Sequence, residues 1–323
     1  MPENSLSQKV HQLINQQIES WPLATSNYAG LASVASRTIE FDGFKVKVQF
    51  NPERIRSSAA KTDAKSIQQR ACFLCQKNQQ DVQKGVDFQD DYTLLINPFP
   101  IFKKHLTVPL NRHLPQEIEP YFNDLLQLSR ELPEFTFFYN GPKCGASAPD
   151  HFHFQAGNAD EMPIDTELDS IVAQLGEPIL KNEHTRLVAV GKAYLRKLLY
   201  LESDSSTQIA YYFQQILERL KQRGQEGEPM LNVLARFTQQ KWRIVIFPRD
   251  RQRPSQFFAE GQEQILMSPA SVEMGGLAIL PRKEDFEKLT AKDLISIYEQ
   301  VTINDTDFER LKDQLKELAP YSQ

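Results

Sequence analysis

Residues 135–157 read FTFFYNGPKCGASAPDHFHFQAG, two apolar runs around a turn of small residues. The second run places His151, His153 and Gln155 at alternate positions. Because alternate residues of a strand point to the same face, these three polar side chains share one face, and Phe152 and Phe154 share the other. A row of imidazole and amide groups makes a poor core face, since buried polar groups need partners. The pattern therefore predicts a strand whose polar face meets a polar ligand.

A phosphate group suits that face. A neutral imidazole can attack phosphorus while its other nitrogen is held by a backbone carbonyl, and a neighbouring amide can donate to phosphate oxygens. The preceding turn adds backbone N–H groups, the amide of Asn140, the amine of Lys143 and the hydroxyl of Ser147, which together form a cradle for an oxyanion. The alternative is that His151 and His153 are structural or merely exposed to solvent.

The same stretch resembles the active-site strand of the histidine triad superfamily, in the branch where Gln replaces the third His. That branch contains galactose-1-phosphate uridylyltransferases, dinucleoside tetraphosphate phosphorylases (ATP adenylyltransferases) and GDP-hexose phosphorylases. The resemblance implies that His153 is the catalytic nucleophile and that Gln155 holds the phosphate oxygens. The chain departs from the pattern at Pro149-Asp150, because the branch has Pro directly before the first His.

The composition is that of an ordinary globular chain. Of 323 residues, 40% are hydrophobic and 24% charged, and the net charge is −5, which gives no reason to expect nucleic-acid binding. No apolar run approaches the roughly 20 residues that span a bilayer, and the first ten residues lack the apolar core of a secretory signal. With three cysteines, a reducing cytoplasmic setting is expected rather than a disulfide framework.

The segment 51–61 carries Arg54, Arg56 and Lys61 among serines, with little apolar content. One interpretation is a solvated loop. The other is a phosphate-binding arm, because the uridylyltransferases and phosphorylases have a similar Pro-x-Arg segment that contacts phosphates. The three cations are therefore candidate substrate-binding residues.

Cys72-Phe73-Leu74-Cys75 places two thiolates at a spacing that can ligate one Zn²⁺, with a redox motif as the alternative. No thioredoxin-like pattern of strands and helices surrounds it. The run closely resembles the structural zinc knuckle of galactose-1-phosphate uridylyltransferases. The resemblance implies that His113 and His151 are the other two ligands, which gives a closed Cys₂His₂ site. His105 is a further candidate ligand, and its alternative is a hydrogen bond to the backbone.

The segment LLINPFPIFKKHLTVPLNRH, residues 94–113, resembles the nucleotide-binding hairpin of the phosphorylases and of histidine triad proteins. The resemblance implies that Asn97 and Phe99 lie near the base or ribose. Strands are expected at 92–97 and 105–109, an amphipathic helix at 114–132, and strands at 135–139 and 151–156.

The order of strand, strand, helix, strand, strand recurs after residue 166, without a His pair or a C-x-x-C motif. We therefore predict an α+β fold of two histidine-triad-like halves, with a central antiparallel sheet and outer helices. The expected domains are a helical extension at 1–40, a catalytic half at 41–165 and a degenerate half at 166–323. The basic loop 249–254 is either a solvated turn or a reach towards the phosphates from the second half.

The resemblance implies a nucleotidyltransferase of the phosphorylase type. The donor would be a nucleoside diphosphate sugar or a dinucleoside polyphosphate, the intermediate a nucleotidyl-His153, and the acceptor phosphate or a sugar phosphate. A hexose-1-phosphate uridylyltransferase is the alternative that the zinc knuckle favours. A non-catalytic nucleotide-binding protein is the alternative that the residue inserted before His151 favours. A homodimer is a possible assembly.

Overall fold

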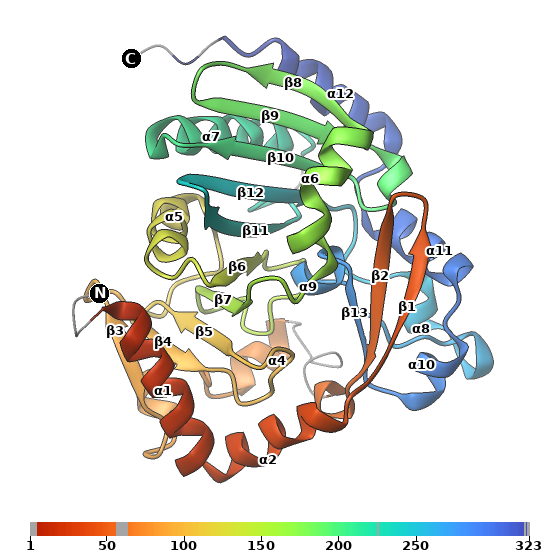
Figure 1. The fold of residues 1–323 in the computed structure, drawn as a ribbon. Helices are drawn as coiled ribbons and strands as arrows, with labels where there is room; N and C mark the ends of the chain where they lie inside the picture. The colour runs from red at the N-terminus through yellow and green to blue at the C-terminus, as the bar shows by residue number, and fades with distance from the viewer. Residues whose placement is uncertain (1–4, 56–63, 225, 320, 322–323) are drawn as a thin grey trace.

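The computed structural model describes residues 5–55, 64–224, 226–319 and 321, and its centre is a large antiparallel sheet (Figure 1). The ten strands follow the order β3-β4-β5-β7-β6-β11-β12-β10-β9-β8, and each strand runs antiparallel to its neighbours. Their bounds are β3 Gly85–Phe88, β4 Tyr92–Ile96, β5 His105–Pro109, β6 Phe135–Asn140, β7 His153–Asn158, β8 Gly176–Lys181, β9 Thr185–Val190, β10 Leu198–Ser203, β11 Leu231–Thr238 and β12 Lys241–Pro248.

The two halves of this sheet repeat one arrangement. In the first half the chain runs β4, β5, α5, β6, β7, and in the second it runs β9, β10, α7, β11, β12. Both sets of four strands are ordered first, second, fourth, third from the outside inwards, and β6 pairs with β11 where the halves meet. This topology confirms the predicted fold of two related halves around one antiparallel sheet.

Helices cover both faces of the sheet, and the sheet separates two hydrophobic cores. One face packs against α1, α2, α5, α7 and α12, and its core includes Phe152 and Phe154. The other face packs against α6, α9, α11 and a second sheet. The helices are α1 Leu6–Ser20, α2 Pro22–Gly30, α4 Ala64–Gln69, α5 Phe122–Glu131, α6 Pro163–Leu175, α7 Ser206–Lys221, α8 Ser255–Phe258, α9 Ser271–Met274, α10 Lys283–Lys288, α11 Ala291–Val301 and α12 Asp305–Lys316.

The second sheet has three strands, β1 (Ala35–Phe41), β2 (Phe44–Phe50) and β13 (Leu277–Leu280). β1 and β2 form a hairpin whose turn has Gly43 at φ +80°, a backbone region that glycine enters without strain. β13 pairs parallel with β2. The expected helical extension at residues 1–40 thus ends in a strand, β1.

The helix expected at 114–132 is shorter in the structure. Pro120 has no N–H to donate and lies in the short 3₁₀ turn Glu119–Tyr121, so regular helix begins only with α5. The stretch before it is irregular, and its residues contact the segment that leads into β7 and His153 itself. Among the described residues, no helix is long and apolar enough to span a membrane.

Candidate active site

A cleft of about 520 Å³ opens on the face of the first half that carries His153 and Gln155. Its floor is the sheet, where Thr107 of β5, Gln155 of β7 and Phe138 of β6 are neighbours in register. The predicted substrate-binding and catalytic residues that line the cleft are Arg54, Asn97, Phe99, Asn140, Ser147, His153 and Gln155.

Of the other predicted substrate-binding residues, the structure describes only Lys143. Lys143 is not among the lining residues. It lies near the tip of the turn that follows β6, and its Nζ donates to the carbonyl of Glu226 at 3.0 Å, so it fastens the turn to the second half. Arg56 and Lys61 fall outside the described residues.

His153 is positioned as a neutral imidazole. Its Nδ1–H donates to the His151 carbonyl at 2.8 Å, so Nε2 carries the lone pair. Burial lowers the pKa of His153 to about 4, although the hydrogen bond to the backbone opposes this shift. The ring is therefore uncharged at neutral pH, as a nucleophile must be. The predicted alternation is correct for His153 and Gln155, which line the cleft while Phe154 lies in the core on the opposite face. The strand begins later than the expected residue 151, so His151 precedes β7 and faces Cys72 instead of the cleft.

Gln155 is oriented by His105. The N–H of Ile101 donates to His105 Nδ1 at 3.1 Å, so the proton of this neutral ring is on Nε2. Nε2 lies 3.3 Å from Gln155 Oε1, which must then be the acceptor. Burial lowers the pKa of His105 to about 3, and the nearby Arg54 adds to that effect. The carbonyl of Gln155 is thereby fixed on the His105 side, and its NH₂ group is the donor left for a ligand.

Gln116 holds the backbone of the active-site strand, a role that the sequence does not reveal. Its Oε1 accepts from the N–H of His153 at 2.8 Å, and its Nε2 donates to the carbonyls of His153 and Asn140. The side chain is 1% exposed. Gln116 thus joins β6 to β7 where the direct pairing of the strands has ended.

Between β6 and β7 the turn approaches the second half closely. Gly145 has φ +101°, and a Cβ there would lie 2.6 Å from Cβ of Ala270. Only glycine combines that conformation with that approach. Gly145, Ala146 and Ser147 line the cleft, so the small residues of the turn bring backbone close to a bound ligand, as predicted.

The predicted Cys₂His₂ set meets beside this turn. Ligand atoms of Cys72, Cys75, His113 and His151 lie within 4.8 Å of one another. Nδ1 of His151 is 3.2 Å from the Cys72 sulfur, and Nδ1 of His113 is 3.1 Å from the Cys75 sulfur. His105, the other candidate ligand, is not part of this group among the described residues.

The chemistry of these four side chains fits a metal ion. His151 Nε2–H donates to the Leu110 carbonyl at 2.7 Å, which leaves Nδ1 deprotonated and facing the thiols. Burial alone would raise the pKa of Cys72, but the contact with His151 and the hydrogen bonds from the backbone N–H groups of Leu74 and Cys75 lower it to about 6. A thiolate and an oriented imidazole are the donors that Zn²⁺ prefers.

The residue inserted before His151 has a structural use. Asp150 forms an ion pair with Arg70 at 2.7 Å and lies 3.6 Å from His113 Nε2. Arg70 lines the cleft, so the Asp150 carboxylate links the Cys₂His₂ cluster to a cation in the wall of the cleft. His153 lines the cleft although a residue is inserted before His151.

The second half supplies a wall of the same cleft, through Gln252, Arg253, Ser268 and Glu273. Burial raises the pKa of Glu273 to about 7, although the positive charges of Arg54 and Arg249 oppose this shift. The basic loop 249–254, ambiguous in the sequence, thus reaches the cleft with two of its side chains.

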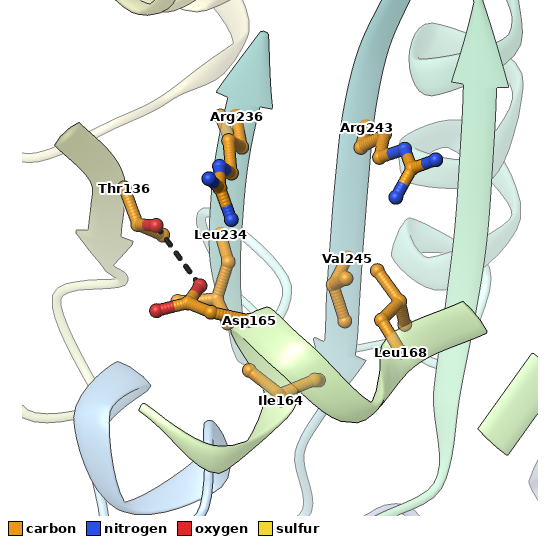
Figure 2. A pocket seen from close by; sticks show the side chains of 9 residues that line it. Thr136, Ile164, Asp165, Leu168, Leu234, Arg236, Arg243 and Val245 are labelled. Carbon is orange, nitrogen blue, oxygen red and sulfur yellow. Dashed lines mark hydrogen bonds between the residues drawn. The ribbon is translucent and has the colours of Figure 1, made fainter. Parts of the chain in front are cut away.

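The matching face of the second half is closed (Figure 2). Leu234 of β11 pairs with Phe138 of β6, so both lie on the face that carries the cleft. Over β11 and β12, however, Ile164, Asp165 and Leu168 of α6 leave a cavity of only about 30 Å³. That volume admits a water molecule and no nucleotide, as expected of a degenerate copy.

Glu228 is a second residue without a sequence signal. Its carboxylate accepts from the N–H of Ile118 at 2.5 Å and from the hydroxyl of Tyr139 at 2.7 Å, which joins the second half to the segment that carries Gln116. Burial raises the pKa of Glu228 to about 7, against the lowering effect of these two hydrogen bonds.

This pKa gives a prediction about stability. The folded state binds the Glu228 proton more tightly than the unfolded state, so this group contributes stability that is lost as pH rises from about 4.5 to about 7. The melting temperature of Glu228→Gln, taken relative to that of wild type, should therefore rise as pH increases across that window. The measurement is the difference in Tm from pH 5 to pH 8. Glu117→Gln, an exposed carboxylate on the neighbouring segment, controls for the lost charge. A difference for Glu228→Gln that stays constant with pH would contradict the prediction.

Two family models match the chain. Residues 13–158 match a family described as "Domain of unknown function (DUF4922)", and residues 173–321 match one described as "GDPGP1-like, C-terminal domain". A comparison with curated proteins gave no match.

Solved structures of the same fold include the yeast Ap4A phosphorylase Apa2. Its crystal structure superposes with a TM-score of 0.58 at 18% identity, covering 94% of this chain and 96% of that one. The same enzyme in complex with Ap4A gives a TM-score of 0.60 at 16% identity, with 94% and 99% covered. The likeness extends over both halves of the chain, and it confirms the predicted fold.

Proposed function

We propose that this chain, a histidine-triad fold with a GDPGP1-like C-terminal domain, is a phosphorylase-type nucleotidyltransferase that forms a covalent nucleotidyl-His153 intermediate. The observation that carries the proposal is the geometry of His153. A neutral imidazole faces a cleft of nucleotide size, its Nδ1–H is held by a carbonyl, and an oriented amide lies two residues away.

The reaction takes two displacements at one site. His153 Nε2 attacks the α-phosphorus of the donor, and the bond from that phosphorus to the bridging oxygen breaks. The leaving group departs as a sugar phosphate or a nucleotide. An oxygen of inorganic phosphate then attacks the same phosphorus, the P–N bond breaks, and a nucleoside diphosphate is released. His151 O stabilises the positive charge on the ring, and the Gln155 NH₂ group donates to the phosphoryl oxygens.

The donor classes follow from the two comparisons. The GDPGP1-like domain favours a nucleoside diphosphate hexose, and the fold of an Ap4A phosphorylase favours a dinucleoside polyphosphate. Asn97 and Phe99 would contact the base or ribose, and Arg54, Arg70 and Ser147 the phosphates, since all five residues line the cleft. Burial lowers the pKa of Arg54 to about 10, so its charge persists at neutral pH.

The proposal includes a structural zinc ion held by Cys72, Cys75, His113 and His151. The ion takes no part in the chemistry. It would cross-link the knuckle to the start of the active-site strand. There the His151 carbonyl accepts a hydrogen bond from the Nδ1–H of His153. The carboxylate of Asp150 beside His113 is the outer partner that such a ligand commonly has.

The experiment is a donor screen read by intact-protein mass. The purified chain is incubated without phosphate with ADP-, GDP- and UDP-hexoses and with dinucleoside tetraphosphates. A true donor should raise the mass by one nucleoside monophosphate, and added phosphate should remove the adduct and release the nucleoside diphosphate. Uptake of hexose 1-phosphate but not of phosphate would favour a uridylyltransferase. Tight nucleotide binding with no adduct and no turnover would favour a non-catalytic protein.

The role of His105 can be tested separately. His105→Phe keeps the ring but removes the donor that fixes Gln155, so its NH₂ group should point to the phosphate only part of the time. We expect the single-turnover rate of nucleotidylation to fall about 10-fold, less than the roughly 10²-fold expected for Gln155→Ala. In the Gln155→Ala background, His105→Phe should cost little more, because both changes remove one interaction. A full 10-fold loss in both backgrounds would show that His105 acts by another route.

A further inference from the structure

Arg249, the first residue after β12, is fully buried and binds backbone rather than an acid. Its Nε donates to the Val301 carbonyl at 2.9 Å, and its Nη1 donates to Asn232 Oδ1. Nη2 donates to the carbonyls of Arg251, Gln252 and Pro269 at 3.0–3.3 Å. Within the described part of the chain, no carboxylate forms an ion pair with it.

Burying a guanidinium without a carboxylate costs free energy, so we attribute a positioning role to its hydrogen bonds. The planar group has five N–H donors in a fixed fork, and here they hold three separate segments at fixed angles. Those segments are the end of α11, the loop after β12 and the loop before α9. Without the guanidinium, the carbonyls at 251, 252 and 269 would lose their shared donor.

The two loops held by Arg249 carry a wall of the cleft. Gln252 and Arg253 belong to the first loop, and Ser268 and Ala270 to the second. Arg253 Nε donates to Ser268 Oγ at 3.2 Å, and its guanidinium stacks on Phe257 at 4.2 Å. A cation and a hydroxyl thus face the cleft from the second half, and Phe257 supports the cation.

The same arginine is connected to the first half. Asn232, which accepts from Arg249, donates to Asn140 Oδ1 and to the Cys144 carbonyl, each at 2.9 Å. Asn140 also accepts from the N–H of Ser271 and lines the cleft. The position of Arg249 therefore sets the second-half wall relative to the turn that precedes His153.

We infer that Arg253 and Ser268 form a subsite for the phosphate beyond the α-phosphate of the substrate, and that Arg249 is the positioning residue that holds this subsite in place. The inference rests on the proposed function. A guanidinium and a hydroxyl are suited to phosphate oxygens, and the leaving group or the acceptor presents such a phosphate. The degenerate half thereby retains a role in recognition although α6 covers the face that matches the cleft.

The test compares nucleotides that differ by one phosphate. Calorimetric titration gives the Kd of AMP, ADP, GMP, GDP, UMP and UDP for the full chain. Arg253→Gln should weaken the diphosphate that binds best by about 10-fold and leave the matching monophosphate within about twofold. Arg249→Lys should show the same selective loss, because one ammonium with three donors cannot span the acceptors of the guanidinium. In the double variant the losses should not multiply.

Arg219→Lys is the matched control. Arg219 also donates to backbone carbonyls, those of Gln314 and Gln215, but it joins α7 to α12 on the opposite face of the sheet. It should leave both Kd values unchanged. An equal loss for monophosphate and diphosphate in Arg249→Lys, or losses that multiply in the double variant, would overturn the positioning role. An unchanged diphosphate Kd in Arg253→Gln would overturn the subsite. A wild-type chain that binds none of the six nucleotides would instead refute the proposed function.

Discussion

Replacing His153 by alanine should abolish nucleotidyl transfer while the fold remains. The expected loss is at least about 10⁴-fold in turnover, because no other group can take the place of a covalent nucleophile. The backbone N–H and C=O of His153 keep their hydrogen bonds to Gln116, and the lost ring borders an open cleft rather than a packed core. Tm should therefore change little, and bound metal should stay.

The measurement is intact-protein mass after incubation with the best donor, beside Tm and metal content of the same sample. His184→Ala is the matched control, because His184 is an exposed histidine that pairs with Asp204 in the second half. This variant should gain the same mass of one nucleoside monophosphate as wild type does. If His153→Ala gains the mass of one nucleoside monophosphate to the same extent, another residue is the nucleophile and the proposed mechanism is wrong.

The face assignment of the active-site strand could be predicted because it depends only on local geometry. Alternation placed His153 and Gln155 on one side and two phenylalanines on the other, and the structure agrees. The Cys₂His₂ set required more, since Cys75 and His113 lie 38 residues apart. There the resemblance to a known knuckle supplied the missing distance information, and the four side chains do meet.

The residues that the sequence did not reveal all act over long separations. Gln116 binds a strand 37 positions later, and Glu228 binds a backbone N–H 110 positions earlier. A buried glutamine or glutamate has no local pattern that distinguishes it from an exposed one. The partner of β13 has no local signal either, because it is a strand more than 200 residues away in the sequence. Lys143 shows the converse, because a promising local setting did not bring it to the cleft.

The second large effect concerns the cluster of Cys72, Cys75, His113 and His151. We expect one zinc per chain in wild type and almost none in Cys75→Ser, because a serine hydroxyl replaces a thiolate, one of the preferred ligands. Since structural metal binding is also folding free energy, Tm should fall by about 10 °C. His151→Ala should have a similar effect and should also slow nucleotidylation, because it disturbs the residue whose carbonyl holds His153.

Cys144→Ala is the control for the loss of a cysteine. Cys144 is buried and lies outside the cluster, and burial raises the pKa of its thiol to about 12, so it is a poor metal ligand. It should keep full zinc occupancy even if it loses some stability. Metal content is measured by mass spectrometry on dialysed protein, and Tm with and without a chelator. If Cys75→Ser retains a full equivalent of zinc, the four residues are not the site. If wild type carries zinc but the chelator leaves Tm unchanged, the ion is not what holds the knuckle to the active-site strand.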